Sequence, residues 1–348
     1  MVLTLNRYLI NNLLWNQRFY LKLEEEVHPF NQLHLFRPLS KAYNGSITFW
    51  STPSPEPNLS DAFWLEVEAA FRHQVKSSDK SESKIYMAAR KLAASILIWQ
   101  PNPEKILFVS ILRAGVPITE WLCQMLPGSV GAALSLFVGI GIDKVALSAI
   151  ERDFPDRTII FVDGWTGKGG VAREISKLNK GPLAVLIDPW GWADFAGTRE
   201  DIFCPSACFT GLATLGFSRT FFLDNDNFFS AYRFSEDFAQ PKIVKSWKML
   251  CSKPLSSSEI SNIIQSETDI DKFFSATTDL RIHSNEVCRA LINAAPEILF
   301  FADDQQFVEK HFSLLLKLAK QRAIPAEFNV CHLNELKTKV ACRLSTVL

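Results

Sequence analysis

The sequence predicts an α/β fold built on a parallel β-sheet. Three short, almost wholly apolar runs at 106–110, 158–162 and 182–187 have the length and composition of buried strands. Helix-like segments at 116–126 and 170–178 alternate with them. Apolar strands that alternate with helices are typical of a parallel sheet covered on both faces. The loops that follow such strands emerge at one edge of the sheet, where ligands usually bind.

Composition and charge limit the class of protein. The 348 residues are enough for two or three domains with their own cores, and 47% of them are hydrophobic while 21% are charged. Because 37 basic residues balance 37 acidic ones, the charge argues against a protein that coats nucleic acid, although one small basic patch remains compatible with it. The longest apolar stretch, 130–142, is too short to span a membrane.

The N-terminus and the cysteines indicate the compartment. The first fifteen residues have no basic start, continuous apolar block or small-residue cleavage site of the kind that marks a secreted protein. Seven scattered cysteines, an odd number, favour reduced thiols over a disulfide framework. We therefore expect a cytoplasmic protein with no membrane partner, and the sequence predicts no oligomeric state.

We divide the chain into four predicted parts at the places where its composition changes. An aromatic-rich N-terminal region is followed by apolar strands that alternate with helices, and then by a serine-rich segment. The N-terminal part contains two segments with helical spacing of apolar residues, at 61–75 and 84–99. The predicted parts are an irregular and helical N-terminal hood (1–100), the α/β core (101–233), a connector (234–278) and a small α/β C-terminal domain (279–348).

The C-terminal domain shows a second alternation of strands and helices. Its seventy residues fall within the usual range for a small three-layer domain. The pattern predicts helices at 284–294, 305–323 and 334–344, with strands at 297–302 and 327–331.

A glycine-rich turn follows the strand at 158–162. The turn contains Asp163, Thr166 and Lys168 among four glycines, and a helix begins after it. Free N–H groups at a helix start, together with the helix dipole, bind phosphate, and glycines let the backbone approach closely. Asp163 could accept sugar hydroxyls or help to hold hydrated Mg²⁺. The alternative is that the glycines only permit a tight turn between strand and helix.

Two loops together resemble the type I phosphoribosyltransferases. The segment LRAG after the strand at 106–110 is similar to their pyrophosphate loop, and the glycine-rich turn is similar to their phosphoribosyl loop, in the order that this family has. The resemblance implies a core that binds phosphoribosyl pyrophosphate with Mg²⁺ at Asp163. It implies catalytic roles for Arg113, Asp163 and Lys168, with the substrate bound by Ala114, Gly115, Asp163, Thr166, Gly167, Lys168, Gly169 and Gly170.

The turn departs from the family pattern at Gly164, where a second acidic residue is usual. Because ribosyl transfer passes through a cationic sugar, carboxylates must compensate its charge. That work would then fall to pyrophosphate, magnesium and Asp188 or Asp194. The acceptor base is not identified; Trp190 and Trp192 could stack on a planar ring or pack in the core.

The segment GTREDIFCPSAC, 197–208, offers a different chemistry. Arg199 could hold a phosphate or carboxylate, or could pair with Glu200 and Asp201. Cys204 and Cys208 could supply a nucleophile if a histidine lies close enough to act as base, and otherwise are small buried thiols. The candidate histidines of the N-terminal part are His28, His34 and His73.

The segment HSNEVCRALINAAPEILFFADD, 283–304, resembles the RNA-binding fold shared by L7Ae ribosomal proteins and Pelota. The resemblance implies that Asn285 and Glu286 contact base edges of a structured RNA and that Arg289 contacts its backbone. His283 stands where that family has glycine. Ser284 also has a plain interpretation, because serine is a good helix N-cap.

VDGWTGKG, GTRED and CPSAC together resemble the phosphoribosyltransferase-like StiP proteins associated with tellurite resistance and stress response. The function this implies is a phosphoribosyltransferase acting on phosphoribosyl pyrophosphate and an unidentified base, with an RNA-binding C-terminal domain. Two alternatives stay open. One is an inactive regulatory protein that binds phosphoribosyl pyrophosphate or a nucleotide. The other is a cysteine protease-like hydrolase that uses Cys204 or Cys208.

Overall fold

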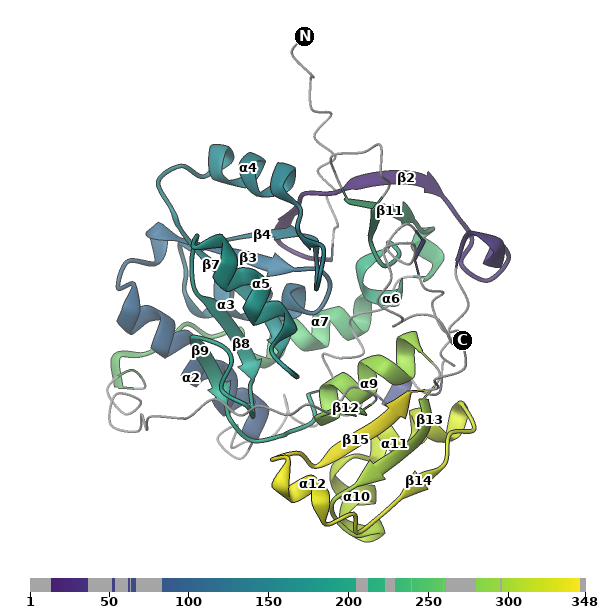
Figure 1. The fold of residues 1–348 in the computed structure, drawn as a ribbon. Helices are drawn as coiled ribbons and strands as arrows, with labels where there is room; N and C mark the ends of the chain where they lie inside the picture. The colour runs from purple at the N-terminus through teal and green to yellow at the C-terminus, as the bar shows by residue number, and fades with distance from the viewer. Residues whose placement is uncertain are drawn as a thin grey trace.

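The computed structural model places two α/β units side by side, a large one with a central sheet and a smaller C-terminal one (Figure 1). Among the residues that the structure describes, four short helical segments lie outside the main layers of these units. They are the helix α6 (Leu212–Leu215) and the 3-10 helices η1 (Leu33–Leu35), η5 (Pro103–Lys105) and η7 (Glu236–Phe238). The residues that the structure describes are 14–36, 52–53, 62, 64–66, 83–204, 212–222, 229–238, 240–258, 260, 280–294 and 296–344.

The central sheet has six strands in the order β1-β4-β3-β7-β8-β9, and every neighbouring pair is parallel. This confirms the predicted α/β class with a parallel sheet. The strands are β1 (Gln17–Phe19), β3 (Ile106–Ile111), β4 (Val130–Leu134), β7 (Thr158–Trp165), β8 (Leu183–Ile187) and β9 (Phe195–Thr198).

The three predicted strands are the centre of this sheet, and the other three were not predicted. β3, β7 and β8 are buried on both faces, so their sequences are almost wholly apolar. β1 has only three residues and comes from the predicted hood, while β9 lies in a segment rich in glycine and aspartate. Neither carries a periodic signal long enough to predict a strand.

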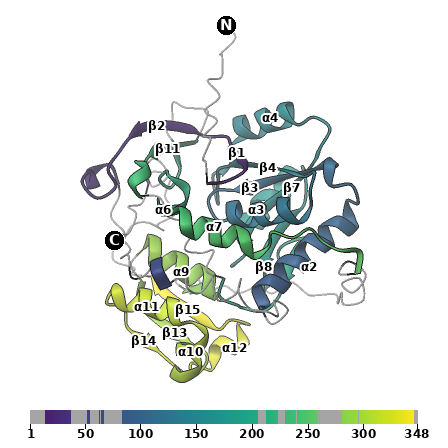
Figure 2. The same cartoon turned by 180° about the vertical axis from the view of Figure 1, so that it is seen from behind.

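Helices cover both faces of the sheet (Figures 1 and 2). Phe108 and Ile160 belong to the cluster of side chains on one face, whereas Val109 and Phe161 belong to the cluster on the other, because successive strand residues point in opposite directions. One face carries α2 (Lys84–Trp99), α3 (Gly115–Met125) and α7 (Pro241–Leu250), and the other carries α4 (Lys144–Asp153) and α5 (Gly170–Leu178).

Predicted and observed helices agree closely in the core. The helices expected at 84–99 and 170–178 match α2 and α5, and α2 begins where the Ser83 side chain accepts the N–H of Tyr86. The helix expected at 61–75 lies mostly outside the described residues. Within the described ranges, none of the helices combines the length and the apolar character needed to cross a bilayer.

A second, three-stranded sheet lies beside the central one, in the order β10-β11-β2. Asp143 ties it to the core, because one carboxylate oxygen caps α4 at the N–H of Ala146 and the other accepts the N–H of Phe229, both at 2.9 Å. A short hairpin of β5 and β6 precedes α4. These strands are β2 (Lys22–Glu26), β5 (Leu136–Phe137), β6 (Gly141–Ile142), β10 (Phe221–Phe222) and β11 (Phe229–Arg233).

The C-terminal unit is a four-stranded sheet in the order β12-β15-β13-β14 with helices packed on it. Its strands are β12 (Leu280–Ile282), β13 (Pro296–Phe301), β14 (Ala326–Glu327) and β15 (Val340–Leu344). Its helices are α9 (Ser284–Asn293), α10 (Gln305–His311), α11 (Ser313–Gln321) and α12 (His332–Glu335).

Three predictions for this unit were wrong in detail. Of the strand expected at 327–331, only Glu327 lies in a strand, β14. The helix expected at 334–344 is α12 followed by strand β15, because Lys337 has a φ of 49° that ends the helix. The apolar side chains of 340–344 then face the core from a strand that pairs with both β12 and β13. The helix expected at 305–323 is divided at Phe312 into α10 and α11.

Trp121 of α3 and Trp247 of α7 hold these two helices together. Their rings stack at a centroid distance of 3.6 Å with an angle of 9° between the planes. The Trp121 indole donates to the Trp247 carbonyl at 2.7 Å, and the Trp247 indole donates to the Pro117 carbonyl at 2.8 Å. Both side chains are fully buried, so each indole N–H has the partner that burial requires.

We expect Trp247→Ala to lower the free energy of unfolding by about 3–5 kcal/mol, because it removes a buried ring and leaves a cavity against Trp121. Met249→Ala, at an exposed position of the same helix, should change it by less than about 0.5 kcal/mol. Urea unfolding followed by fluorescence measures both values. Equal losses in the two variants would contradict the proposed role of the stacked pair.

Candidate functional site

The two predicted binding loops lie against each other at the carboxyl edge of the sheet. A Cβ added to Gly115 would sit 2.1 Å from the backbone oxygen of Val162, and one added to Gly164 would sit 3.2 Å from that of Ala114. The LRAG loop after β3 therefore touches the end of β7, where the glycine-rich turn begins. Arg113 at the head of this loop is buried.

Asp188 organises the polar groups at this edge. It follows β8, its side chain is fully buried, and it forms an ion pair with Arg199. Its other partners are the hydroxyl of Thr166 and the N–H of Ala193, the latter at 2.8 Å. Arg199 thus neutralises a buried carboxylate, and the hydroxyl of Thr166 is committed to the same carboxylate. Arg199 thus binds a carboxylate, as one of its two predicted roles had it, but the carboxylate belongs to Asp188 and not to Glu200 or Asp201.

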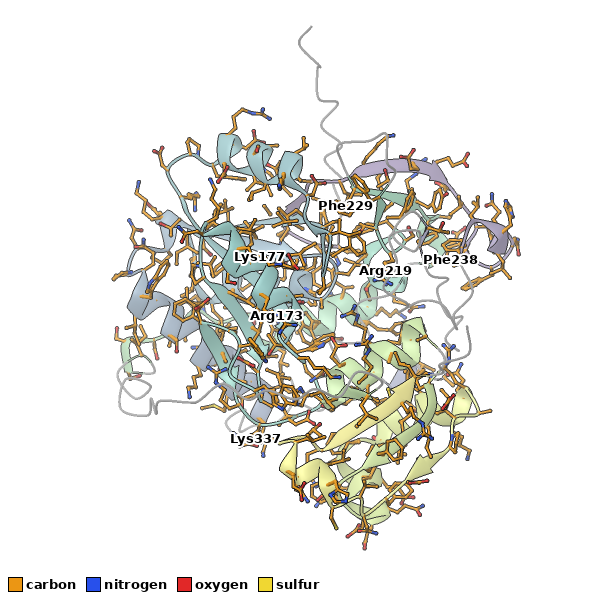
Figure 3. All side chains as sticks on the ribbon, in the orientation of Figure 1. Arg173, Lys177, Arg219, Phe229, Phe238 and Lys337 are labelled. Carbon is orange, nitrogen blue, oxygen red and sulfur yellow. The ribbon has the colours of Figure 1, made fainter. Side chains whose placement is uncertain are left out.

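The remaining residues of the turn have structural partners. Gly169 adopts a φ of +74° and lies against the Trp192 ring, which a Cβ would approach to 2.2 Å. Arg173 of α5 lies 5.1 Å from the centre of that ring and donates to the Lys168 carbonyl at 2.8 Å. Figure 3 shows Arg173 on α5 above this turn. Trp192 therefore packs against the turn, and its ring leaves no room for a side chain at Gly169.

Trp190 and Asp194 also have packing roles. Trp190 is almost fully buried, and its indole donates to the Leu336 carbonyl of the C-terminal unit at 2.8 Å. Asp194 accepts the N–H of Leu183 at 2.8 Å and so fixes the start of β8. Of the two interpretations of the tryptophans, core packing describes Trp190, because its ring has no exposed face on which a base could stack.

Helix α9 of the C-terminal unit lies across the glycine-rich turn. The indole of Trp165 donates to Glu286 at 3.1 Å, and a Cβ added to Gly167 would lie 3.1 Å from the Glu286 side chain. Arg289 forms an ion pair with Glu286 at 3.1 Å. Glu286, predicted to read RNA bases, therefore contacts the core instead, and RNA binding at this position stays a prediction that requires the contact to open.

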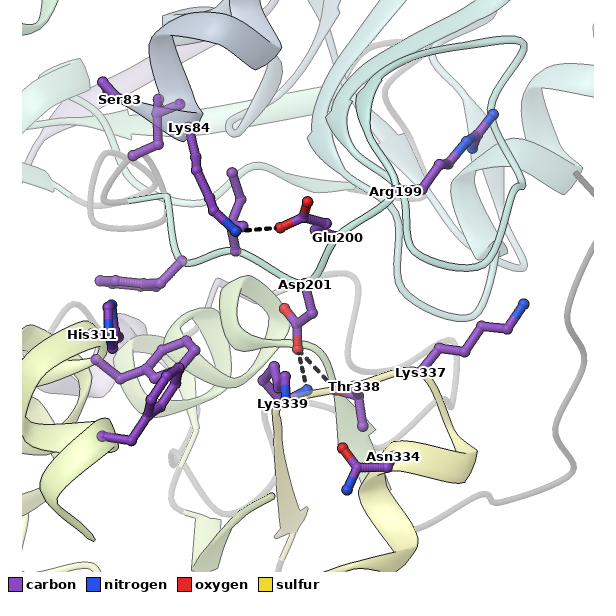
Figure 4. Close-up of a pocket in the computed structure, with 15 residues that line it drawn as sticks. Ser83, Lys84, Arg199, Glu200, Asp201, His311, Asn334, Lys337, Thr338 and Lys339 are labelled. Atoms are coloured by element: carbon purple, nitrogen blue, oxygen red, sulfur yellow. Dashed lines mark hydrogen bonds and ion pairs between the residues drawn. The ribbon is translucent and has the colours of Figure 1, made fainter. Parts of the chain in front are cut away.

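A second connection runs through residues 199–204, which we call the strap. The Asp201 carboxylate accepts four hydrogen bonds from the C-terminal unit: the Ser284 N–H at 2.9 Å and hydroxyl at 2.7 Å, the Thr338 hydroxyl at 3.0 Å and the Lys339 N–H at 2.7 Å. The Asn285 side chain accepts the Cys204 N–H and donates to the Ile202 carbonyl, each at 2.9 Å. Figure 4 shows Asp201 against Thr338 and Lys339. The strap and the start of α9 thus run side by side.

His283 lies at this junction and is the residue that sequence reasoning undervalued. Its ring is 1% exposed, and the backbone of Thr166 lies within hydrogen-bonding reach of it. The edge of the Trp190 ring packs on it at 5.5 Å. Burial lowers the pKa of His283, and the carboxylates of Asp201, Asp188 and Glu286 partly offset that effect. Its φ of 73° is a backbone conformation that glycine adopts without strain and that other residues rarely adopt.

The cysteines differ in accessibility and in acidity. Cys204 is fully buried in the strap, Cys331 is exposed, and Cys208 lies outside the described residues. Burial raises the pKa of Cys123 and of Cys342 to about 12, so both thiols stay protonated and unreactive at neutral pH.

The histidines predicted from the N-terminal part do not meet a cysteine in the described structure. His28 accepts the N–H groups of Phe30 and Asn31 in a local turn, and its ring packs on Phe238. His34 lies in η1, near the same turn, and His73 lies outside the described residues. The histidine that lies beside the cysteine-bearing segment is His283.

Asp163 lies near the end of β7, where burial disfavours the charged form of its carboxyl group. Its carboxylate accepts the N–H of Gly164 at 2.7 Å. Burial raises the pKa of Asp163 to about 7, the Gly164 N–H and Arg289 lower it, and Glu286 raises it further. Within the described residues there is no group of three or more His, Cys, Asp or Glu side chains that could hold a metal. Magnesium at Asp163 stays a prediction.

A cavity of about 780 Å³ opens between the strap, the start of α2 and the C-terminal unit. Figure 4 shows Lys84 of α2 paired with Glu200 above the strap, while His311 and Lys337 come from the C-terminal unit. No local sequence pattern predicts this cavity, because its walls come from segments separated by more than a hundred residues. They are Ser83, Lys84, Ile85, Arg199, Glu200, Asp201, Ile202, Phe203, Phe307, His311, Phe312, Asn334, Lys337, Thr338 and Lys339.

We expect Asp201→Ala to lower the free energy of unfolding by about 3 kcal/mol, because it leaves several buried donors of the C-terminal unit without an acceptor. Glu200→Ala is the matched control: its ion pair with Lys84 is exposed, so the loss should stay below about 0.5 kcal/mol. Denaturant unfolding measures both. Equal losses of unfolding free energy in Asp201→Ala and Glu200→Ala would show that Asp201 does not hold the two units together.

The raised pKa of Asp163 predicts a pH-dependent stability. Between pH 4 and 7 the folded carboxyl keeps a proton that the unfolded chain has released, so its contribution to stability is present at low pH and is lost as the pH rises through 7. Asp163→Asn removes this loss. The variant should therefore gain roughly 2 kcal/mol relative to wild type between pH 5 and pH 8, because only about two of the roughly three pKa units of the shift lie above pH 5 and solvent contact weakens their effect.

Thermal unfolding at pH 5 and pH 8 tests this expectation. The exposed Asp156→Asn serves as control and should follow wild type at both values. A difference between Asp163→Asn and wild type that is the same at pH 5 and pH 8 would show that the Asp163 carboxyl has an ordinary pKa.

Comparison with known proteins now bears on the function. The model of a family described as "Tellurite-like stress resistance cysteine protease StiP" matches residues 65–246, slightly more than half of the chain. A protein of Acinetobacter baylyi named "Cysteine protease StiP" is 30% identical over 169 residues, which cover 44% of this chain and 44% of that protein. The match thus spans less than half of the length of this relative.

The predicted transferase activity was wrong by this finding. Both the family and the relative are named as a cysteine protease, a hydrolase, whereas the two loops at the sheet edge had indicated a phosphoribosyltransferase. A glycine-rich turn beside a second loop establishes only the shape of the backbone. The same backbone shape occurs in proteins that catalyse unrelated reactions. The extent of the match shows that the chain belongs to the StiP family.

Proposed function

We propose that this chain is a hydrolase of the cysteine-protease type, with Cys204 as its nucleophile. The names of the family and of the relative support the reaction class. One structural observation carries the assignment to Cys204. The strap brings Cys204 alongside the segment that contains His283, through hydrogen bonds from the Cys204 N–H to Asn285 and from Ser284 to Asp201.

His283 has the properties of a general base for this nucleophile. Because burial lowers its pKa, the ring is neutral near pH 7 and can accept a proton. A hydrogen bond to the Thr166 backbone would hold one ring nitrogen, and the other could then take the proton. The carboxylates of Asp201 and Asp188 act on the ring and would stabilise the imidazolium that forms when it takes the thiol proton.

The proposed reaction needs no reactant other than the chain, the amide substrate and water. The Cys204 thiol gives its proton to His283, and the thiolate attacks the carbonyl carbon of an amide to form a tetrahedral intermediate. The amine leaves with the proton from His283, and a thioester remains on Cys204. Water then attacks the thioester, giving one proton to His283, and its collapse returns that proton to the thiol and releases the carboxylic acid.

The described arrangement is a closed form of such an enzyme. Cys204 is fully buried, and His283 is covered by Trp190. A substrate carbonyl can reach the thiol only if the strap moves relative to α9. The hydrogen bonds that Asp201 and Asn285 make between the strap and the C-terminal unit are the contacts that would have to open.

The C-terminal unit keeps its likeness to L7Ae and Pelota as part of the proposal. Its support is a strand, β12, that leads into α9 at the Asn285-Glu286 pair, followed by strand β13 and an acidic turn. In the closed form Asn285 binds the strap and Glu286 binds Trp165. Opening of the junction would therefore free the thiol and the predicted RNA-binding residues together.

Substitution of the thiols tests the hydrolase. Against a fluorescently quenched casein, Cys204→Ser should lose at least about a thousandfold in kcat/KM, because the hydroxyl is a far weaker nucleophile without a strong base. The exposed Cys331→Ser should keep wild-type activity. His283→Asn, which tolerates the positive φ, should lose about a hundredfold or more and should change the acid limb of the pH profile.

The alternatives give distinct results. Loss of hydrolysis in Cys208→Ser with full activity in Cys204→Ser would move the nucleophile to the second cysteine. Hydrolysis that persists when both cysteines are replaced would refute a thiol mechanism for this chain. Circular dichroism of each variant separates a lost nucleophile from a lost fold.

A further inference from the structure

The Asn285 side chain makes a paired contact with the backbone of the strap. Its carboxamide oxygen accepts the Cys204 N–H, and its carboxamide nitrogen donates to the Ile202 carbonyl, each at 2.9 Å. Asn285 is fully buried, so this pair of hydrogen bonds is enclosed in protein. One side-chain amide thus satisfies a backbone donor and a backbone acceptor that lie on either side of Phe203.

This contact has the hydrogen-bond pattern of two parallel β-strands. In a parallel pair, one residue donates its N–H to the carbonyl before the residue opposite and accepts the N–H after it. The Asn285 carboxamide likewise donates to the carbonyl before Phe203 and accepts the N–H after it. Asn285 therefore supplies with its side chain the donor and the acceptor that a residue of an extended peptide supplies with its main chain.

The cavity beside the strap leaves space for such a peptide. Phe203 and Ile202 line this cavity, whose volume of about 780 Å³ lies within the range of ligand-binding clefts. Phe307 of α10 borders the same space and is 40% exposed. In a parallel pair the side chains of opposite residues lie on the same face. The side chain of a peptide residue opposite Phe203 would therefore enter the cavity.

We propose that residues 202–204 form a main-chain recognition site for an extended peptide substrate, and that the Asn285 carboxamide fills this site in the closed form. The inference rests on the hydrolase function proposed above and names how its substrate is held. A peptide residue replaces the carboxamide, donates its N–H to the Ile202 carbonyl and accepts the Cys204 N–H. The bound backbone then runs beside the proposed nucleophile. Because main-chain groups make these contacts, the site accepts peptides of varied sequence.

The exchange of Asn285 for a peptide keeps the strap backbone paired. If the carboxamide left without a replacement, the Cys204 N–H and the Ile202 carbonyl would lose their partner, which is unfavourable wherever water does not take its place. An extended peptide offers both partners, so it competes directly with Asn285. A side chain of similar volume without an amide would not compete, and peptide binding should become tighter.

Binding of a neutral peptide tests the site without turnover. The probe is fluorescein-labelled Ser-Thr-Val-Thr-Ser, titrated by fluorescence anisotropy with the full chain that carries Cys204→Ser, alone and together with Asn285→Leu. The double variant should bind the probe at least about tenfold more tightly. A counterpart of the probe that is methylated at its three central nitrogens cannot donate to the Ile202 carbonyl, and it should bind at least about tenfold more weakly.

Ser284→Ala is the matched control for Asn285→Leu. It also removes a contact between the strap and α9, the hydroxyl bond to Asp201, but it leaves the Asn285 carboxamide in place. It should raise the affinity for the probe by no more than about threefold. Equal tightening by Ser284→Ala and Asn285→Leu would show that any loosening of the junction is sufficient, and would overturn the role of the carboxamide.

The methylated peptide tests main-chain recognition separately. Circular dichroism shows whether Asn285→Leu is folded, and if it is not, the two peptides are compared on Cys204→Ser alone. Equal binding of the methylated and the unmethylated peptide would overturn the recognition site in either background.

The recognition site and the hydrolase fail separately. Binding that depends on the peptide N–H groups and on Asn285, without Cys204-dependent cleavage of any peptide, supports the site and refutes the hydrolase. In the chain with an intact Cys204, Asn285→Leu should raise kcat/KM for the quenched casein about tenfold. Cys204-dependent cleavage with an unchanged kcat/KM in Asn285→Leu keeps the hydrolase and refutes the site.

Discussion

The arrangement of this protein depends on the Asp201 carboxylate. It lies on a strap that leaves the last strand of the parallel sheet, and it accepts four hydrogen bonds from the C-terminal unit. Carboxylate acceptors give stronger hydrogen bonds than neutral ones, and each buried donor that lost this partner would pay for its desolvation. Because the same strap carries Arg199 to Asp188 and Cys204 to Asn285, one side chain fixes both the domain interface and the proposed nucleophile.

Burial at this interface shifts the pKa values of acidic and basic groups in opposite directions. It raises the pKa of Asp163 to about 7 and lowers the pKa of His283, so each group favours its neutral form. Burial also raises the pKa of Glu286, but Arg289, Arg281, the Trp165 indole and His283 together outweigh that effect and leave the pKa lowered. A junction with few net charges is stable when closed, and it would take up or release protons when water enters.

The sequence was sufficient for the centre of the fold and insufficient for the site. β3, β7 and β8 could be predicted because strands buried on both faces must be apolar, and α2 and α5 because their apolar residues have helical spacing. The turn after β7 was placed at the correct edge for the same reason. Its neighbours could not be predicted, because Trp165 meets Glu286 and Asp201 meets Ser284 across more than eighty positions. Local patterns carry no information about such pairs.

The proposed nucleophile and the proposed base are both buried, and this imposes a condition on catalysis. In the closed form no substrate can reach Cys204, so turnover must use a form in which the strap has left α9. A substrate shifts that equilibrium only if it binds the open form more tightly than the closed one. A peptide that makes contacts in the cavity bordering Phe203 only after the strap has moved would satisfy this condition. Binding energy far from the thiol would then be spent on exposing it, and the intact hydrogen bonds of Asp201 would keep the enzyme latent until a suitable segment arrives.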